Sequence, residues 1–206
     1  MNMKHEKSAV VLIEFQNQWT EKGLYHWLIK GALKSRNVME NTYEFVQKAR
    51  AAGIPVIHAP LVIDPDNKRG WLAHLTFGKV FTKGSRKAGI TPGLFEKGDI
   101  CVTGRYAFDA FIGSNLESLL KEHGITTLLI CGFTTDQCVA KTMKTALDKG
   151  FNAYMVSDCT ATMNGLFQKI TEAKFQPNVI DHQTALDRMI DNDKNVLKPE
   201  FAAPAT

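Results

Sequence analysis

The stretch over residues 126–149 reads TTLLICGFTTDQCVAKTMKTALDK and predicts a strand, a tight turn and a helix, in that order. Its first part, residues 126–131, is an apolar run too short for a helix, and Gly132 ends it. After a polar turn, apolar residues recur at helical spacing, namely Val139, Met143, Ala146 and Leu147. The sequence therefore predicts a tight connection from a buried strand to a helix.

Cys138 falls in the first turn of the predicted helix. Backbone N–H groups there have no helical partner and the helix dipole is positive at this end, so both favour a thiolate over a thiol. In open parallel sheets, ligands bind in the crevice at the carboxyl ends of the strands. We therefore expect a potential nucleophile in such a crevice, although by pattern alone Cys138 equally fits a small buried apolar residue.

The rest of the chain predicts alternating strands and helices. Further strands are expected over residues 9–15 (AVVLIEF), 54–60 (IPVIHAP), 99–103, 151–157 and 178–181, and helices over 38–52, 112–120, 163–175 and 183–190. Residues 16–33 are irregular in pattern, and residues 61–96 form a long loop with no sustained period. This order predicts an α/β fold, a three-layer, doubly wound, Rossmann-like sandwich with a six-stranded, mostly parallel sheet.

Composition favours one globular domain over residues 1–206, with residues 192–206 as a mobile tail. The net charge of +4 is scattered, which gives no support to nucleic-acid binding. The apolar run near the N-terminus stops at Glu14, too early for a signal peptide or a membrane span. The four cysteines have neither a CxxC spacing nor the density of a disulfide scaffold, so we expect reduced thiols and a cytoplasmic protein.

Two charged residues are expected at the same edge of the sheet as Cys138. Glu14 lies near the carboxyl end of the first strand and Arg105 follows the third. A thiolate nucleophile needs a neighbouring cation or dipole, a proton shuttle and N–H donors for an oxyanion, and these residues supply such groups. Taken singly, Glu14 is more simply a paired structural carboxylate and Arg105 a loop anchor.

Four segments together resemble the isochorismatase-like cysteine hydrolases, the superfamily of nicotinamidase and N-carbamoylsarcosine amidase. They are VLIEFQNQW, GRYAFDAF followed by SNLESLL, LLICGFTTDQCVAKTMKTALDKGF, and VSDCTA. The resemblance covers residues 9–161, and the block ending in TTDQCV is its most specific part. It implies the six-stranded fold and hydrolysis of an amide or related C–N bond of a small molecule, with no cofactor.

The resemblance also implies roles by position. Cys138 matches the nucleophile, Glu14 the acidic residue that is usually Asp, and Arg105 the position where lysine is expected. Arginine keeps a positive charge but cannot give up a proton at working pH, so any mechanism that needs a lysine proton shuttle is in doubt. The family's cis peptide would fall at Phe133–Thr134 and would aim the N–H groups of Thr134 and Cys138 at one oxygen, as an oxyanion hole.

Nicotinamidases of this superfamily bind a divalent ion through an Asp-x-His pair and a nearby second histidine. Residues 57–75 contain His58, Asp64 and His74 but no Asp-x-His. His58 in an apolar strand is expected to be a hydrogen-bonded core histidine, and His74 a loop residue. We therefore expect no metal.

Several aromatic residues lie in segments near the expected mouth of the site: Trp19, Trp71, Phe77, Phe81 and Phe108. Most are expected to be core or subunit contacts. Trp19 and Phe108 flank the catalytic positions and are the preferred candidates for an apolar wall that holds a planar substrate. By resemblance we expect a homo-oligomer whose long loop supplies contacts.

Three functions are consistent with these residues. The first is hydrolysis of a small-molecule amide through a Cys138 acyl-enzyme. The second is a catalytically silent family member that serves as a binding or assembly protein, and Arg105 is the feature that motivates it. The third is vinyl ether hydrolysis, as in isochorismatase itself, but that chemistry works without a cysteine, so Cys138 argues against it.

Overall fold

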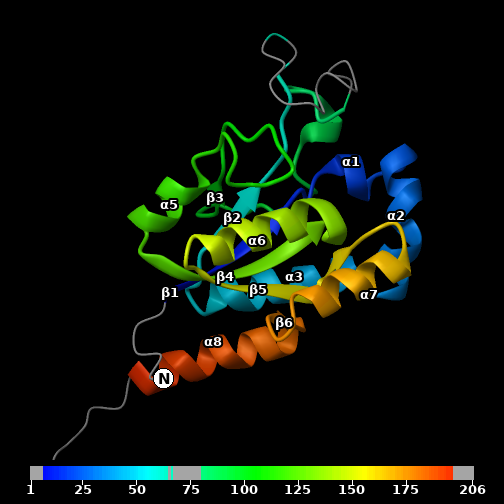
Figure 1. The fold of residues 1–206 in the computed structure, drawn as a ribbon. Coiled ribbons are helices and arrows are strands. Elements are labelled where there is room, and N and C mark those ends of the chain that lie inside the picture. Colours follow the sequence, from blue (N-terminus) through cyan, green and yellow to red (C-terminus); the bar gives the residue numbers. More distant parts are fainter. Residues whose placement is uncertain (1–6, 65, 67–79, 197–206) are drawn as a thin grey trace, which may run out of the picture.

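The computed structural model describes residues 7–64, 66 and 80–196, and these residues form a layered α/β fold around one sheet (Figure 1). The sheet has six strands in the order β3-β2-β1-β4-β5-β6, and every neighbouring pair is parallel. The strands are β1 (Lys7–Ile13), β2 (Val56–Ala59), β3 (Ile100–Cys101), β4 (Ile125–Phe133), β5 (Asn152–Ala161) and β6 (Val179–Ile180). The predicted six-stranded α/β architecture is confirmed.

Helices cover both faces of the sheet, which is why the central strands are almost wholly apolar. One face packs against α2 (Leu24–Ser35), α3 (Val38–Ala51) and α8 (His182–Val196), and the other against α5 (Leu116–Glu122) and α6 (Ala140–Asp148). Figure 1 shows α5 and α6 on one side of the sheet and α3 and α8 on the other. Successive residues of β1 alternate between the two cores, with Val10 and Leu12 in one and Val11 and Ile13 in the other.

The fold places the carboxyl ends of β1 and β4 close together. Ile13 and Gly132 are partners in the register of these two strands. Gly132 has φ +136°, and a Cβ atom there would lie 2.1 Å from the Ile13 carbonyl oxygen. Only glycine therefore permits this approach, and the residues that follow the two strands come together beyond it.

The structure corrects the interpretation of residues 16–33 as irregular. These residues contain α1 (Asn17–Thr20) and most of α2. On α2 only Ile29 and Leu33 are buried, whereas Leu24 and Trp27 are 69% and 63% exposed. The helix consequently lacks the broad apolar stripe that marks most amphipathic helices in a sequence.

Two helices, α5 and α8, differ most from their predicted bounds. Ile112 precedes α5 and is exposed, although the sequence pattern placed it on the apolar face of that helix. Helix α8 continues to Val196, beyond the predicted end at residue 190. The rest of the predicted mobile tail, residues 197–206, lies outside the described residues, as do Trp71, His74 and Phe77.

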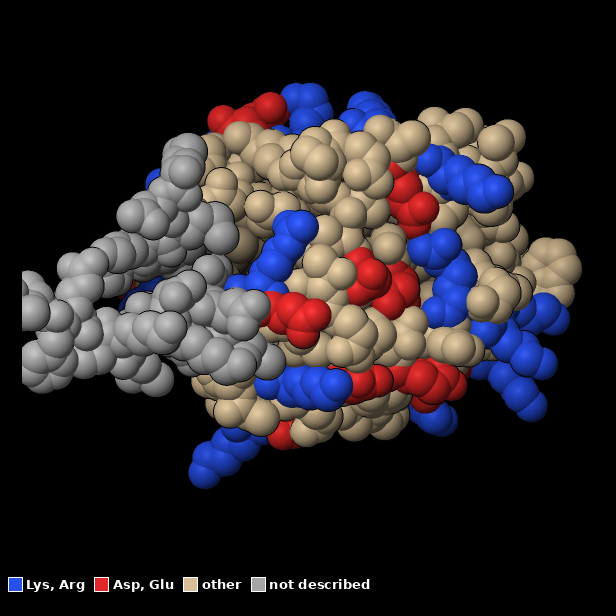
Figure 2. Space-filling view, turned by 90° about the horizontal axis from the view of Figure 1, so that it is seen from below, with Lys and Arg blue, Asp and Glu red and all other residues tan. Residues whose placement is uncertain are grey.

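Charged side chains of both signs are interspersed on the face seen from the α8 side (Figure 2), as expected from the small net charge. Within the described parts of the chain, no helix is both long enough and apolar enough to cross a membrane.

Candidate active site

Glu14 follows β1 directly and enters the site through an unusual backbone conformation. Its φ is +56°, a left-handed value that is uncommon for a residue with a side chain and that recurs at functional sites. Its carbonyl accepts a hydrogen bond from the Gln16 N–H at 2.6 Å, which closes a tight turn. The carboxylate is 1% exposed, so it needs partners within the protein.

Arg105 supplies the main partner of Glu14. Its Nη2 lies 2.6 Å from Glu14 Oε1 in an ion pair whose two side chains are 0% and 1% exposed. The guanidinium also donates to three backbone carbonyls, those of Ala59 at 2.6 Å, Ala107 at 3.0 Å and Phe108 at 2.7 Å. Its planar set of donors thus ties the carboxylate to the ends of two strands and to the segment that follows the third.

Cys138 lies beside this ion pair, within the π-helical turn η2 (Thr135–Val139) that precedes α6. Burial, followed by the negative charge of Glu14, raises the pKa of the Cys138 thiol well above its usual value, although Arg105 acts in the opposite direction. A hydrogen bond with Glu14 raises the pKa of the thiol further. The expectation of a thiolate was therefore wrong for the resting site, because desolvation and the charge of Glu14 outweigh the effect of Arg105.

The peptide bond Phe133–Thr134 is cis, as the resemblance implied. A hydrogen bond from the Thr134 backbone acts to lower the pKa of the Cys138 thiol, and the Thr134 carbonyl accepts hydrogen bonds from the N–H groups of Gln137 and Val139. The backbone of Thr134 therefore lies beside the sulfur of Cys138.

The two preferred aromatic candidates lie at this site in different ways. Trp19 is buried, and its indole Nε1 donates to Glu14 Oε2 at 3.2 Å, so it holds the second oxygen of the carboxylate. Phe108 is half-buried, and the ammonium of Lys141 lies 4.7 Å from its ring centroid. Phe81 is buried in the core beside Trp19, as expected for a core aromatic residue.

A hydrogen-bond network that the sequence did not predict supports the turn with Cys138. Gln168, on α7 (Gly165–Lys174), is 3% exposed. Its Oε1 accepts from the Thr135 hydroxyl at 2.7 Å, and its Nε2 donates to the Thr160 hydroxyl at 3.1 Å and to Glu172 at 2.8 Å. The only signal in the sequence was a polar residue directly after the apolar pair Leu166 and Phe167.

His58 has the structural role that was expected. It is buried, and its Nε2 lies 2.9 Å from Asp99 Oδ2, which also pairs with Arg50. Burial lowers the pKa of His58, and the hydrogen bond to Asp99 opposes that shift.

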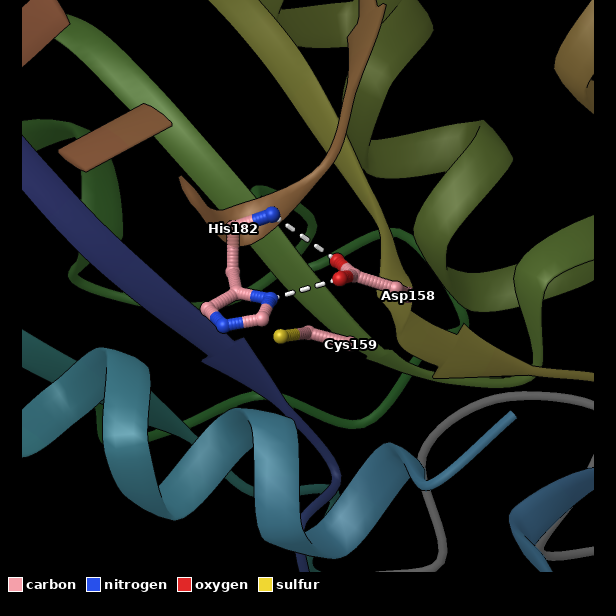
Figure 3. Close-up of side chains that lie close together, drawn as sticks. All are labelled: Asp158, Cys159 and His182. Carbon is pink, nitrogen blue, oxygen red and sulfur yellow. Dashed lines mark hydrogen bonds and ion pairs between the residues drawn. The ribbon is translucent and has the colours of Figure 1, made fainter. Parts of the chain in front are cut away.

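Asp158, Cys159 and His182 are the described residues that come nearest to a metal site (Figure 3). One ligand atom from each lies within 4.8 Å of the others. However, the two Asp158 oxygens accept hydrogen bonds from the His182 backbone N–H and Nδ1, while Gln183 lies 2.9 Å from His182 Nε2. Asp158 and His182 therefore bond to each other at the start of α8, as in a helix cap.

Comparison with known proteins agrees with this geometry. Residues 8–193 match the isochorismatase domain model. Streptothricin hydrolase from Streptomyces noursei is 31% identical over 130 residues, which are 61% of this chain and 45% of that protein, so the chain spans less than half the length of this relative. Ureidoacrylate amidohydrolase from Agrobacterium fabrum is 26% identical over 182 residues, which are 78% of each protein.

The fold also has counterparts among solved structures. A cysteine hydrolase from Pseudomonas syringae pv. phaseolicola superposes with a TM-score of 0.78 over 90% of this chain and 93% of that one, at 17% identity. Such a likeness at low identity shows a shared fold. Since the domain model matches nearly the whole length, the chain belongs to the isochorismatase family.

Proposed function

We propose that this protein hydrolyses an amide or related C–N bond of a small molecule through an acyl-enzyme on Cys138. The observation that carries the proposal is the arrangement of three groups around one sulfur. The buried Glu14 carboxylate raises the pKa of the Cys138 thiol through its charge and a hydrogen bond, the Thr134 backbone acts on the same thiol, and Arg105 holds Glu14 in place. The names of two relatives, a hydrolase and an amidohydrolase, support the same reaction class.

The first half-reaction follows from this arrangement. Sγ attacks the carbonyl carbon while Glu14 takes the thiol proton, and the carbonyl electron pair moves onto oxygen. The N–H groups of Thr134 and Cys138 stabilise that oxyanion. Glu14 then gives the proton to the leaving nitrogen, the C–N bond breaks, and a thioester and a free amine or ammonia result.

Water completes the cycle. Glu14 removes a proton from the water as its oxygen attacks the thioester carbon, and the second tetrahedral intermediate expels the sulfur. The sulfur recovers its proton from Glu14, and the carboxylic acid product leaves. All proton transfers therefore pass through one carboxylate.

Arg105 has no proton to transfer in this scheme, so the scheme does not require a lysine at this position. It remains a cation and positions Glu14 through the ion pair and the three carbonyl contacts. The raised pKa of Cys138 fits the same scheme, because the thiol loses its proton during attack rather than beforehand.

The test is a panel of small amides and ureido compounds, with released ammonia or amine measured and the covalent acyl adduct detected by intact-protein mass spectrometry. We expect Cys138→Ala to lower the rate by about three orders of magnitude or more. Cys101→Ala is the matched control, because Cys101 is the exposed cysteine at the far edge strand β3. Full activity in Cys138→Ala would refute the assignment.

The silent binding or assembly protein remains the second candidate, and Arg105 is the observation that favours it. Hydrolysis that appears in Arg105→Lys but in no panel reaction of the wild type would establish this alternative. A homo-oligomer is compatible with both candidate functions, and light scattering at micromolar concentration tests the oligomeric state.

A further inference from the structure

Lys141 lies on the face of α6 that meets the segment after β3. It follows Cys138 by three residues, and its neighbours on that face are bonded to the same segment. The Thr142 hydroxyl accepts from the Ala110 N–H at 3.0 Å, and the Thr145 hydroxyl donates to Asp109 at 2.6 Å. Cys138 and Lys141 therefore share the side of the helix that faces the Arg105 segment.

The Lys141 side chain reaches the Phe108 ring, in the segment that carries Arg105. Side chains on a helix lean toward its N-terminus, which here is the end that carries Cys138. The ammonium lies 4.7 Å from the centroid of the Phe108 ring. The carbonyl of Phe108 in turn accepts a hydrogen bond from Arg105, so Phe108 connects Lys141 to the buried ion pair.

The positive charge of Lys141 is not matched by a carboxylate among the described residues. The charge of Arg105 is matched by Glu14. Lys144, one turn further along α6, pairs with Asp148. Lys141 is exposed, and it takes part in none of the ion pairs found within residues 7–64, 66 and 80–196.

We propose that Lys141, seated on the Phe108 ring, recognises a carboxylate or similar anionic group of the substrate, so that the substrate class is a small anionic amide. This inference rests on the proposed function of Cys138. The ring shields one side of the ammonium from water, which strengthens its attraction for an anion on the open side. An anionic substituent held there leaves the other end of a small molecule free to reach the sulfur.

The experiment needs no known substrate, because two alkylating reagents of nearly equal size differ in charge. Iodoacetate is an anion and iodoacetamide is neutral, and with both a new S–C bond forms as iodide leaves. The readout is the ratio of the iodoacetate rate to the iodoacetamide rate at Cys138, measured by peptide mass spectrometry at fixed pH. Any change in the reactivity of the thiol itself cancels in this ratio.

We expect Lys141→Gln to lower the ratio at Cys138 roughly three- to tenfold. This is the effect of removing one charge that lies about one helical turn away, near the protein surface. The ratio at Cys101 in the same sample should not change. Lys144→Gln is the matched control, since it removes the same charge from the same helix one turn further from Cys138. It should leave the ratio within about twofold of the wild-type ratio, because exposed charges at longer range are screened.

The outcomes separate the two proposals. If Lys141→Gln leaves the ratio unchanged, or if Lys144→Gln lowers it equally, Lys141 does not recognise the anion and the substrate class is refuted while the Cys138 site stands. If neither reagent modifies Cys138 in the folded wild type, no small electrophile reaches the sulfur. That result would overturn the proposed function and this inference with it.

Discussion

The buried ion pair between Glu14 and Arg105 makes a quantitative prediction about stability. Arg105→Met keeps a long apolar side chain but removes every donor of the guanidinium. The Glu14 carboxylate would lose its 2.6 Å partner, and three backbone carbonyls would lose one donor each. Leaving one member of a buried ion pair alone costs about 3–5 kcal/mol, and unsatisfied carbonyls add to this. We expect the free energy of unfolding to fall by about 4–6 kcal/mol.

A double-mutant cycle isolates the ion pair from the carbonyl contacts. Glu14→Gln removes the charge but leaves Arg105 its three carbonyl acceptors, so a smaller loss of about 2 kcal/mol is expected. In the double variant no buried charge remains without its partner. The free energy of unfolding lost in the double variant should therefore be about 2 kcal/mol smaller than the sum of the losses in the two single variants.

Equilibrium urea denaturation, followed by circular dichroism and tryptophan fluorescence, measures these quantities at one protein concentration. Arg105→Lys belongs in the same series, since it keeps the charge but cannot satisfy four acceptors in one plane, and it should lose about 2 kcal/mol. Additive effects in the cycle, or a loss below about 1 kcal/mol in Arg105→Met, would refute the inference that the two charges are buried and mutually dependent.

Three further predictions concern the strand ends and the catalytic turn. Gly132→Ala should lower the free energy of unfolding by about 3 kcal/mol or prevent folding, because the added Cβ would lie 2.1 Å from the Ile13 carbonyl oxygen; a stable protein with unchanged urea midpoint would contradict this. Gln168→Met should cost about 2 kcal/mol, since the Thr135 hydroxyl loses its acceptor, whereas Lys169→Met on the exposed side of α7 should change stability by less than about 0.5 kcal/mol. The raised pKa of Cys138 means that the folded protein keeps the thiol proton to higher pH than the unfolded chain does. The protonated thiol therefore contributes to stability below about pH 8.5, and this contribution is lost as the pH rises above that value. Urea denaturation between pH 7 and 10 should show a smaller alkaline decline in Cys138→Ala than in the wild type, and equal declines would contradict the shift.

Periodicity along the chain was enough to predict the strands and most helices. Apolar runs such as β1 and the stripe of α3 depend on neighbours within a few residues, and local sequence records them directly. Helix α2 was not predicted, because the exposed apolar residues Leu24 and Trp27 obscure the periodic pattern of its few buried residues. A local pattern thus fails where a helix buries only a little of its surface.

Strand order also predicted that Glu14, Arg105 and Cys138 share one edge of the sheet, because parallel strands bring their carboxyl ends together. It did not determine the protonation of Cys138. That property depends on the burial of the sulfur and on its distance from Glu14, and neither is written in local sequence.

By itself, the sequence determined the α/β architecture, the family resemblance and the three residues proposed for chemistry. Only the tertiary structure decided that Arg105 is an anchor with four acceptors, that Gln168 supports the turn with Cys138, and that Lys141 lies over Phe108. These contacts join residues far apart in the chain, Glu14 and Arg105 being 91 positions apart. Their energies depend on distance, direction and exclusion of water, which are properties of the packed molecule rather than of any segment within it.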